Sequence, residues 1–285
     1  MSLIVQDLSY IHPNKDFLFQ NITFTIPAGE KCAIVGNNGV GKSTLLRILA
    51  GKIPPATGTI VCDDILYMIP QHFGQFDGMS VAEALGLADK LRALSIILDG
   101  RGTEKEYEQL NDEWDIPERL TEAFAKWQIG HIAPDMLMGN LSGGEKTRVF
   151  LAGQDIFKPS IVLMDEPTNH LDTTGRALVY EDIAHTNRTT VIVSHDRTLL
   201  NRLSAIYEMS PTGMQFYPMN YDAYRETVDA ETKAKVTRLE NQQKELAKAE
   251  KSARKTIERQ QKHASRGEKQ NAKKCVARIS MGLIT

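Results

Sequence analysis

The sequence predicts an α/β domain followed by a long projecting helical segment, and three observations lead to this prediction. Short, uninterrupted apolar runs such as Lys31–Val35 and Ile161–Asp165 are typical of strands buried in a parallel sheet. Segments with helical apolar spacing separate these runs. Residues 222–265 are rich in good helix formers, and no proline follows Pro218. A chain of 285 residues is long enough for one large domain with an appendage.

The composition is that of a soluble globular protein. Apolar residues make up 41% of the chain, and no apolar run approaches the roughly 18–20 residues that a membrane span needs. The N-terminus carries no basic segment or cleavage site of a signal peptide. The three cysteines, Cys32, Cys62 and Cys275, match neither a zinc-ligand spacing nor a disulfide framework, so we expect reduced thiols and a cytoplasmic location.

The net charge of −2 conceals a strong asymmetry along the chain. Residues 222–285 contain 16 basic and 9 acidic residues, an excess of seven positive charges, whereas the rest of the chain has an excess of nine negative charges. An acidic body with a basic tail favours a polyanionic partner for the tail. The alternative is a solvated helical tail whose charges serve solubility only.

The N-terminal seventy residues are expected to form strands and turns with one helix. We expect strands over residues 3–5, 22–26, 31–35 and 65–69, a helix over 42–50, and a loop over 53–58. From residue 80 to about 151 the apolar spacing becomes helical, with a polar loop expected over 100–118. Strands return at 161–165 and 190–194, with a helix near 175–183 between them.

The C-terminal segment is expected to be a helix of about 40 residues, roughly 60 Å long, which a domain of this size cannot bury. Its sparse apolar residues form a weak heptad stripe made of Val236, Leu239, Leu246, Ala253 and Ile257. A turn at 265–267 and a returning helix over 268–279 would make it a hairpin. Because the chain stops when that helix has scarcely begun, we expect it to be part of a longer protein.

A glycine-rich segment between a predicted strand and a predicted helix matches G-x-x-x-x-G-K-[ST], a phosphate-binding loop for ATP. Its glycines let backbone N–H groups surround a phosphate, and the helix N-terminus adds partial positive charge. Lys42 would reach the β- and γ-phosphates, and the Ser43 hydroxyl would be a ligand of Mg²⁺. The expected contacts are Gly36, Asn37, Asn38, Gly39, Val40, Gly41, Lys42, Ser43 and Thr44. The alternative is a glycine-rich turn without a ligand.

Two acidic residues end the apolar strand that begins at residue 161. Asp165 is placed to hold Mg²⁺, and Glu166 to act as general base toward the attacking water. Two solvated acids at a strand end are the alternative for this segment taken alone.

A third motif, Leu141-Ser142-Gly143-Gly144-Glu145, predicts a helix start that binds an anion; we call it the LSGGE segment. The same residues also fit a capping box, in which Ser142 caps the helix and Glu145 reaches back. The two interpretations do not compete, because a capped helix start is what binds phosphate.

Together these motifs resemble an ATP-binding cassette (ABC) domain over about residues 1–220, with Gln71, Asp172 and His195 completing the family's motif order. The resemblance implies an ABC-type P-loop ATPase domain with a mixed sheet core, an N-terminal antiparallel β part and a helical subdomain at about 75–151. It also implies that Gln71 contacts Mg²⁺ and the attacking water. Asp172 would lie in the loop toward a partner domain, and His195 would contact the γ-phosphate.

An aromatic residue near the N-terminus usually stacks on adenine in this family. The spacing from the phosphate loop points to His12, with Tyr10 and Phe17 as alternatives. His12 is not the usual Tyr or Phe, so a surface role for this residue stays open.

The segment Pro167-Thr-Asn-His-Leu-Asp172 resembles the ABC-F branch, whose members act on ribosomes. ABC-F proteins join two cassettes by a charged helical hairpin, and residues 221–285 look like the entry to that linker. Positive charge on a narrow helical tip suits contact with an RNA backbone. The basic residues expected around this tip are Arg254, Lys255, Arg259, Lys262, Arg266 and Lys269.

The resemblance also implies that the site is composite. In this family each ATP lies between the phosphate loop of one cassette and the LSGGE segment of another. This chain would therefore need a second cassette, from the same full-length chain or from a second copy. Two other function classes stay open at this point: the ATPase subunit of a membrane transporter, and a chromosome- or repair-associated ATPase.

Overall fold

The computed structural model describes residues 2–12, 16–62, 65–246, 248, 250 and 251. The chain divides into two compact units, Met1–Tyr224 and Arg225–Thr285, and each is considered by itself. The expected turn at 265–267, the returning helix and the six basic residues of the tip lie outside the described residues.

The first unit contains two sheets. A three-stranded antiparallel sheet has the order β2-β1-β4, and a six-stranded sheet has the order β5-β6-β7-β3-β8-β9, parallel except for β9. The strands are β1 Leu3–Ile11, β2 Phe17–Ile26, β3 Lys31–Val35, β4 Thr57–Val61, β5 Leu66–Ile69, β6 Ile161–Asp165, β7 Thr189–Val193, β8 Ala205–Ser210 and β9 Gly213–Tyr217. The predicted mixed sheet core and antiparallel β part are confirmed.

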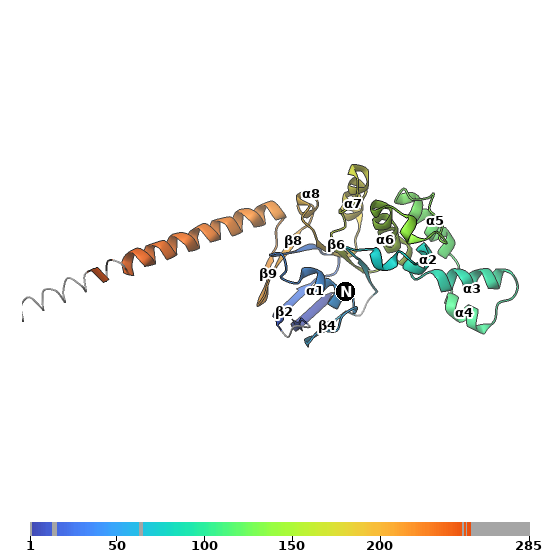
Figure 1. Ribbon diagram of the computed structural model, residues 1–285, viewed down its shortest axis with the longest axis horizontal. Coiled ribbons are helices and arrows are strands. Elements are labelled where there is room, and N and C mark those ends of the chain that lie inside the picture. Colours follow the sequence, from blue (N-terminus) through green and yellow to red (C-terminus); the bar gives the residue numbers. More distant parts are fainter. Residues whose placement is uncertain (1, 13–15, 63–64, 247, 249, 252–285) are drawn as a thin grey trace, which may run out of the picture. The chain divides into compact units, whose positions relative to one another are not determined.

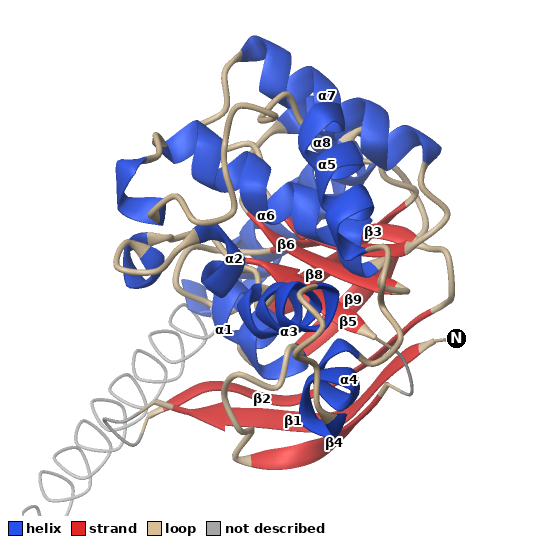
Figure 2. Cartoon of the chain, turned by 90° about the vertical axis from the view of Figure 1, so that its right-hand side faces the viewer, coloured by secondary structure: helices blue, strands red, loops and turns tan. Residues whose placement is uncertain are grey.

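Eight α-helices and two short 3-10 helices are described in this unit. They are α1 Lys42–Leu49, η1 Gly74–Phe76, α2 Val81–Ala84, α3 Ala88–Leu98, α4 Glu104–Leu110, α5 Ile116–Lys126, η2 Met138–Asn140, α6 Gly143–Phe157, α7 Thr173–His185 and α8 Arg197–Leu200. Helices α5, α6 and α7 lie on one side of the six-stranded sheet and the three-stranded sheet lies on the other (Figures 1 and 2).

The main differences from the sequence-based expectation concern two predicted loops and the N-terminal strands, and strands β8 and β9 were not expected. The predicted loop over 53–58 ends in strand β4, which begins at Thr57. Gly58 has a positive φ and lets the backbone of β4 approach β1, because a Cβ on Gly58 would lie 2.6 Å from backbone atoms of β1. The predicted loop over 100–118 contains α4 and the start of α5, because Thr103 and Glu106 form a capping box that starts α4. Strands β1 and β2 are longer than their apolar runs, since both alternate buried and exposed residues.

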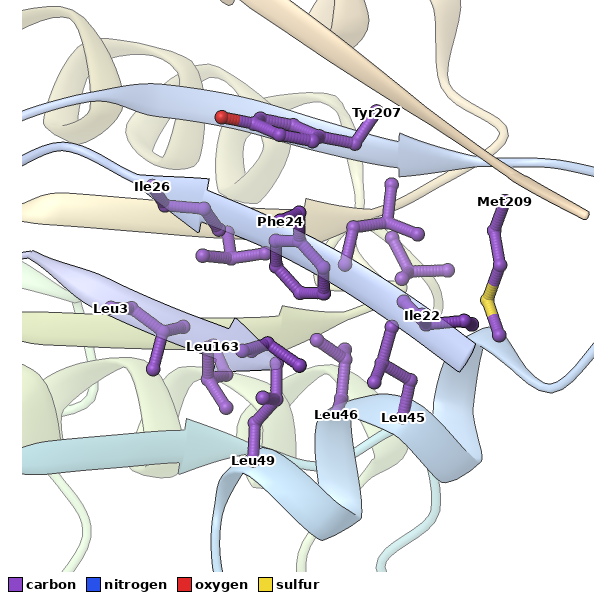
Figure 3. Close-up of a cluster of buried hydrophobic side chains, with 14 of the residues drawn as sticks. Leu3, Ile22, Phe24, Ile26, Leu45, Leu46, Leu49, Leu163, Tyr207 and Met209 are labelled. Atoms are coloured by element: carbon purple, nitrogen blue, oxygen red, sulfur yellow. The ribbon is translucent and has the colours of Figure 1, made fainter. Parts of the chain in front are cut away.

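The main core lies between the two sheets and α1. Leucines of α1 belong to one buried cluster with apolar side chains of β1, β2, β6 and β8 (Figure 3). This layer holds α1 firmly behind the phosphate loop, because burial of a leucine side chain contributes about 1.5–3 kcal/mol.

Helix α6 is anchored to strand β5 by a close contact. The Tyr67 hydroxyl donates a hydrogen bond to the Phe150 carbonyl at 3.0 Å, and the ring lies against Gly153. A Cβ at Gly153 would lie 2.0 Å from this hydroxyl oxygen. The contact matters for the site, because α6 begins with the LSGGE segment and β5 ends just before Gln71.

The second unit contains the continuation of a helix that spans 221–246. Within this unit Val236, Leu239 and Leu246, three members of the predicted heptad stripe, are 50%, 59% and 64% exposed. Pairing of the stripe stays a prediction. Among the described helices, none is long and apolar enough to cross a membrane.

Candidate functional site

The chemically important residues follow the carboxyl ends of four strands of the six-stranded sheet. Gly36 follows β3, Gln71 follows Pro70 after β5, Asp165 ends β6 and His195 comes two residues after β7. The order β5-β6-β7-β3 makes these strands consecutive neighbours. Because parallel strands end at the same edge of the sheet, these residues lie along that edge although they are far apart in sequence. Ligand sites of open α/β sheets are found at this edge.

The phosphate loop packs closely against strand β8, and hydrogen bonds from Lys42 brace it from within. Gly36 has φ 149°, and a Cβ on it would lie 2.4 Å from the Met209 carbonyl oxygen of β8. Gly41, with φ 105°, caps α1. The Lys42 ammonium donates to the carbonyls of Gly36 and Asn37 at 2.9 and 3.1 Å, and burial lowers its pKa. The Val40 side chain is buried in the core, so it supplies only backbone to the loop.

Ser43 and Asp165 form a polar contact across 122 residues of sequence. The Ser43 hydroxyl donates a hydrogen bond to a carboxylate oxygen of Asp165 at 3.1 Å. Asp165 is 2% exposed, and burial raises its pKa above the ordinary aspartate value, while the Ser43 hydrogen bond opposes that shift. The hydrogen bond therefore places the Asp165 carboxylate beside the start of α1, directly after the phosphate loop.

Glu166 is buried and held in a strained conformation. Its backbone has φ 52°, and its N–H donates to the Val193 carbonyl at 2.8 Å. One carboxylate oxygen accepts from the His195 backbone N–H at 3.3 Å, and the other lies 3.5 Å from the His195 ring Nε2. Burial raises the Glu166 pKa, against the opposing charge of His195. A left-handed conformation of a non-glycine residue is typical of functional sites.

Many of these residues line one cleft with a volume of about 390 Å³, within the range of ligand pockets. The lining residues are His12, Leu18, Asn38, Gly39, Gly41, Lys42, Ser43, Thr44, Gln71, Asp165, Glu166, Val193 and His195. The cleft thus gathers most of the predicted phosphate contacts, all the predicted metal ligands and all the predicted catalytic residues.

The three candidates for adenine stacking differ in their surroundings. His12 lines the cleft. The Tyr10 ring packs 6.2 Å from that of Phe19, beside the core. Phe17 is 53% exposed and is not among the residues that line the cleft. Of the three, His12 is the one among the residues that line the cleft.

The LSGGE segment does not line this cleft. Ser142 caps α6 in a capping box with Glu145, as the sequence predicts. Both glycines also permit close packing: a Cβ on Gly144 would lie 2.9 Å from the His170 carbonyl oxygen, and one on Gly143 would lie 3.2 Å from His170 Cβ. His170, with φ 63°, belongs to the loop after Glu166. The start of α6 and that loop therefore pack directly together.

Asp172 caps α7 and also lies outside the cleft lining. Its carboxylate accepts from the Gly175 N–H at 2.8 Å and from the Arg148 guanidinium at 2.6 Å. These hydrogen bonds, with Gly175 the larger cause, lower the Asp172 pKa.

Sequence reasoning missed four residues at these places. Leu18 and Val193 line the cleft, Arg148 holds Asp172, and His131 holds Glu145. Leu18 and Val193 sit in ordinary strands, and the partners of Arg148 and His131 are distant in sequence, so none carries a local signal.

Comparison with known proteins identifies the family. The ABC transporter family model matches residues 19–169. An ABC transporter F family member 4 from Arabidopsis thaliana is 31% identical, covering 81% of this chain and 31% of its own length. A tylosin resistance ATP-binding protein from Streptomyces fradiae is 29% identical, and the match covers 80% of this chain and 46% of that protein. The chain thus spans less than half the length of these curated relatives.

A further relative is similar over most of its length. The energy-coupling factor transporter ATP-binding protein EcfA1 from Geobacillus kaustophilus is 31% identical, covering 68% of this chain and 70% of its own. The structure of a nucleotide-free ATP-binding cassette from an ABC transporter superposes with a TM-score of 0.59 at 16% identity. The superposition covers 80% of this chain and 96% of that chain, and it confirms the fold. The chain therefore belongs to the ABC transporter family, and it is an ATP-binding cassette of that family of ATPases.

Proposed function

We propose that this cassette belongs to an ABC-F protein and that it acts on the ribosome, in the cytoplasm, through a basic helical linker. The observation that carries the proposal is the order of two features in the sequence: the segment Pro167–Asp172, and the segment 222–285 after the cassette, which carries an excess of seven positive charges. The similarity to an F family member over most of this chain supports it.

At the site, Lys42 and the loop backbone would bind the phosphates of ATP. Ser43 and Asp165 offer two hard oxygen ligands that lie 3.1 Å apart, which fits Mg²⁺. Among the described residues, no group of three or more His, Cys, Asp and Glu side chains could hold a metal. Mg²⁺ would therefore take its other ligands from phosphate oxygens, water and Gln71, and it would neutralise charge on the transferred phosphoryl group.

Glu166 would act as the general base of hydrolysis. This carboxylate lines the cleft and would accept a proton from the attacking water. His195 would orient the Glu166 carboxylate and contact the γ-phosphate. Gln71 would position the water. Burial of Glu166 raises its proton affinity, and that makes it a better base than a solvated glutamate.

Cassettes of this family act as dimers or as two cassettes in one chain. The LSGGE segment and Asp172 lie outside the cleft that contains Lys42, which supports a composite site. We propose that Ser142, Gly143 and Gly144 of a second cassette close over the ATP. ATP binding would then close the pair, and hydrolysis would open it.

The second candidate function is the ATPase subunit of a membrane transporter. The similarity to EcfA1 favours it, since it extends over 70% of that protein. A transporter subunit has no evident use for the basic stretch that follows Tyr217, so we place this function second.

The Glu166→Gln variant should accumulate on ribosomes in the presence of ATP. Because the change stops proton abstraction but keeps the nucleotide contacts, the closed state should persist. Sedimentation with purified ribosomes through a sucrose cushion would measure this, with the wild-type chain in ADP and Glu122→Gln, an exposed glutamate of α5, as controls. Protein that stays in the supernatant contradicts the ribosomal role. Copurification with a membrane protein would favour the transporter subunit. Preferential binding to duplex DNA over ribosomal RNA would favour a chromosome- or repair-associated ATPase.

Replacing Gly36 by alanine should lower affinity for ATP by about tenfold or more. A methyl group there would meet the Met209 carbonyl oxygen of β8, and the backbone, at φ 149°, is in a region that suits glycine. Titration with a fluorescent ATP analogue measures the effect. Gly39→Ala is the matched control, because Gly39 has φ 81° but a methyl group on it would meet no atom within 4 Å. Equal losses in both variants would show that the contact with β8 is unimportant.

A further inference from the structure

The end of α6 that should bind phosphate already holds an anion of its own. The Glu145 Oε2 atom accepts hydrogen bonds from the Ser142 backbone N–H at 2.9 Å and from the Ser142 hydroxyl at 2.7 Å. The Ser142 Oγ in turn accepts from the Glu145 N–H at 3.3 Å. A hydroxyl has one proton to donate, and that proton is engaged by the carboxylate.

The second oxygen of this carboxylate is also engaged. His131 lies in the segment before α6, and its Nε2 is 2.9 Å from the Glu145 Oε1. Hydrogen bonds from Ser142, and then from His131, lower the Glu145 pKa to about 2. An ionised carboxylate only accepts hydrogen bonds, so the His131 Nε2 must carry a proton. Glu145 is therefore held at both oxygens.

A bound carboxylate at this helix end affects phosphate binding. The N–H groups of the first turn of a helix have no partners within the helix, and they favour a negative charge. Here the ionised Glu145 satisfies that preference from within the chain. An arriving phosphate would meet a negative charge at the same helix end, and it would compete for the Ser142 donors.

We propose that the Glu145 carboxylate is an internal competitor of the nucleotide phosphate, positioned by His131, and that it must release Ser142 before the LSGGE segment binds phosphate. The inference rests on the proposed role of this segment in a composite ATP site. Glu145 and His131 are thus positioning residues, which set how strongly the segment attracts a phosphate.

The chain offers a matched control for this inference. Ser80 and Glu83 form the same capping box at the start of α2, with Glu83 Oε2 accepting from the Ser80 N–H at 2.7 Å and from its hydroxyl at 2.9 Å. Neither residue belongs to the LSGGE segment or lines the cleft. A change at Glu83 therefore reports the effect of altering a capping box alone.

Glu145→Gln should strengthen phosphate binding at the LSGGE segment. The amide oxygen can still accept from Ser142, so the cap is kept, but the negative charge is gone. We expect the dissociation constant for inorganic phosphate, followed by the NMR amide signals of Gly143 and Gly144, to fall by about twofold to fivefold, the effect of one charge at a helix end. Glu83→Gln should leave it unchanged. Equal constants in the wild type and Glu145→Gln, or no response of these signals in either, would overturn the inference.

A second measurement separates this inference from the proposed function. Sedimentation velocity with ATP, in the Glu166→Gln background, reports association of two cassettes. If Glu145→Gln strengthens phosphate binding at Gly143 and Gly144 but no pair forms with ATP, the competition is supported and the composite site of two copies fails. The other informative result is that pairs form, and that they need the same ATP concentration with and without Glu145→Gln. In that case the competition is overturned and the composite site stands.

Discussion

Replacing Glu166 by glutamine is expected to lower the rate of ATP hydrolysis by about 10²–10⁴-fold, the usual contribution of a general base. Glu166 is 8% exposed and faces the cleft that also contains Lys42 and Asp165. Glutamine keeps the volume and an oxygen that can accept from the His195 N–H, but it cannot take a proton from water. Binding of ATP should be retained. Phosphate release at saturating ATP measures the rate, and titration with a fluorescent ATP analogue measures the binding.

The control for this variant is Glu122→Gln, which changes an exposed glutamate of α5 and should leave hydrolysis unchanged. The wild-type rate should fall as the pH falls through the Glu166 pKa, because only the ionised carboxylate accepts a proton. Since burial raises that pKa, the loss should begin at a higher pH than for a solvated glutamate. Hydrolysis by Glu166→Gln within a few fold of the wild type would exclude Glu166 as the base.

Gly153→Ala is expected to lower the free energy of unfolding by about 2 kcal/mol or more. The new methyl would lie 2.0 Å from the Tyr67 hydroxyl oxygen, 2.7 Å from its Cζ and 3.2 Å from Leu85. The Tyr67 ring is fixed by its hydrogen bond to Phe150 and by packing 5.6 Å from the Phe157 ring. Overpacking of this kind costs about 1–3 kcal/mol or more, and it outweighs the gain of roughly 1 kcal/mol for alanine in a helix. Chemical denaturation followed by circular dichroism measures the change.

A double-mutant cycle tests the cause. In the Tyr67→Phe background the closest atom is removed, so Gly153→Ala should cost less there than in the wild type. Gly78→Ala is the control, because a Cβ at Gly78 meets no atom within 4 Å. An equal cost in both backgrounds would show that the hydroxyl contact is not what requires glycine.

Much of the site could be predicted from sequence because its motifs are local. A strand that leads into a glycine-rich turn and a helix is specified by contiguous residues, and both β3 and β6 have the predicted bounds. Three strands were absent from the sequence-based expectation: β8, although it is largely buried, and the edge strands β4 and β9. Strands β4 and β9 escape prediction because their local sequence signal is weak. They lie at the edges of their sheets, and most of their side chains are exposed or half-buried, so they lack the apolar run that marks a buried strand.

The helical insertion shows the same limit. Residues 100–118 are polar, which favours a loop, yet α4 forms because Thr103 and Glu106 cap it and Leu110 is buried. A short polar helix has weak periodicity, and its stability comes from its cap and its neighbours. The packing that decides it is not visible in a window of sequence.

By itself, the sequence determined which residues form the phosphate loop, the pair Asp165 and Glu166, and the LSGGE segment, since each motif is contiguous and its chemistry follows from its residue types. The tertiary structure decided which of them meet. The sheet order brings Ser43 within 3.1 Å of Asp165, places the Met209 carbonyl behind Gly36, and leaves Ser142 outside the cleft. It also decided that Glu145 is held by His131, because hydrogen bonds between separate segments depend on how the chain folds back on itself.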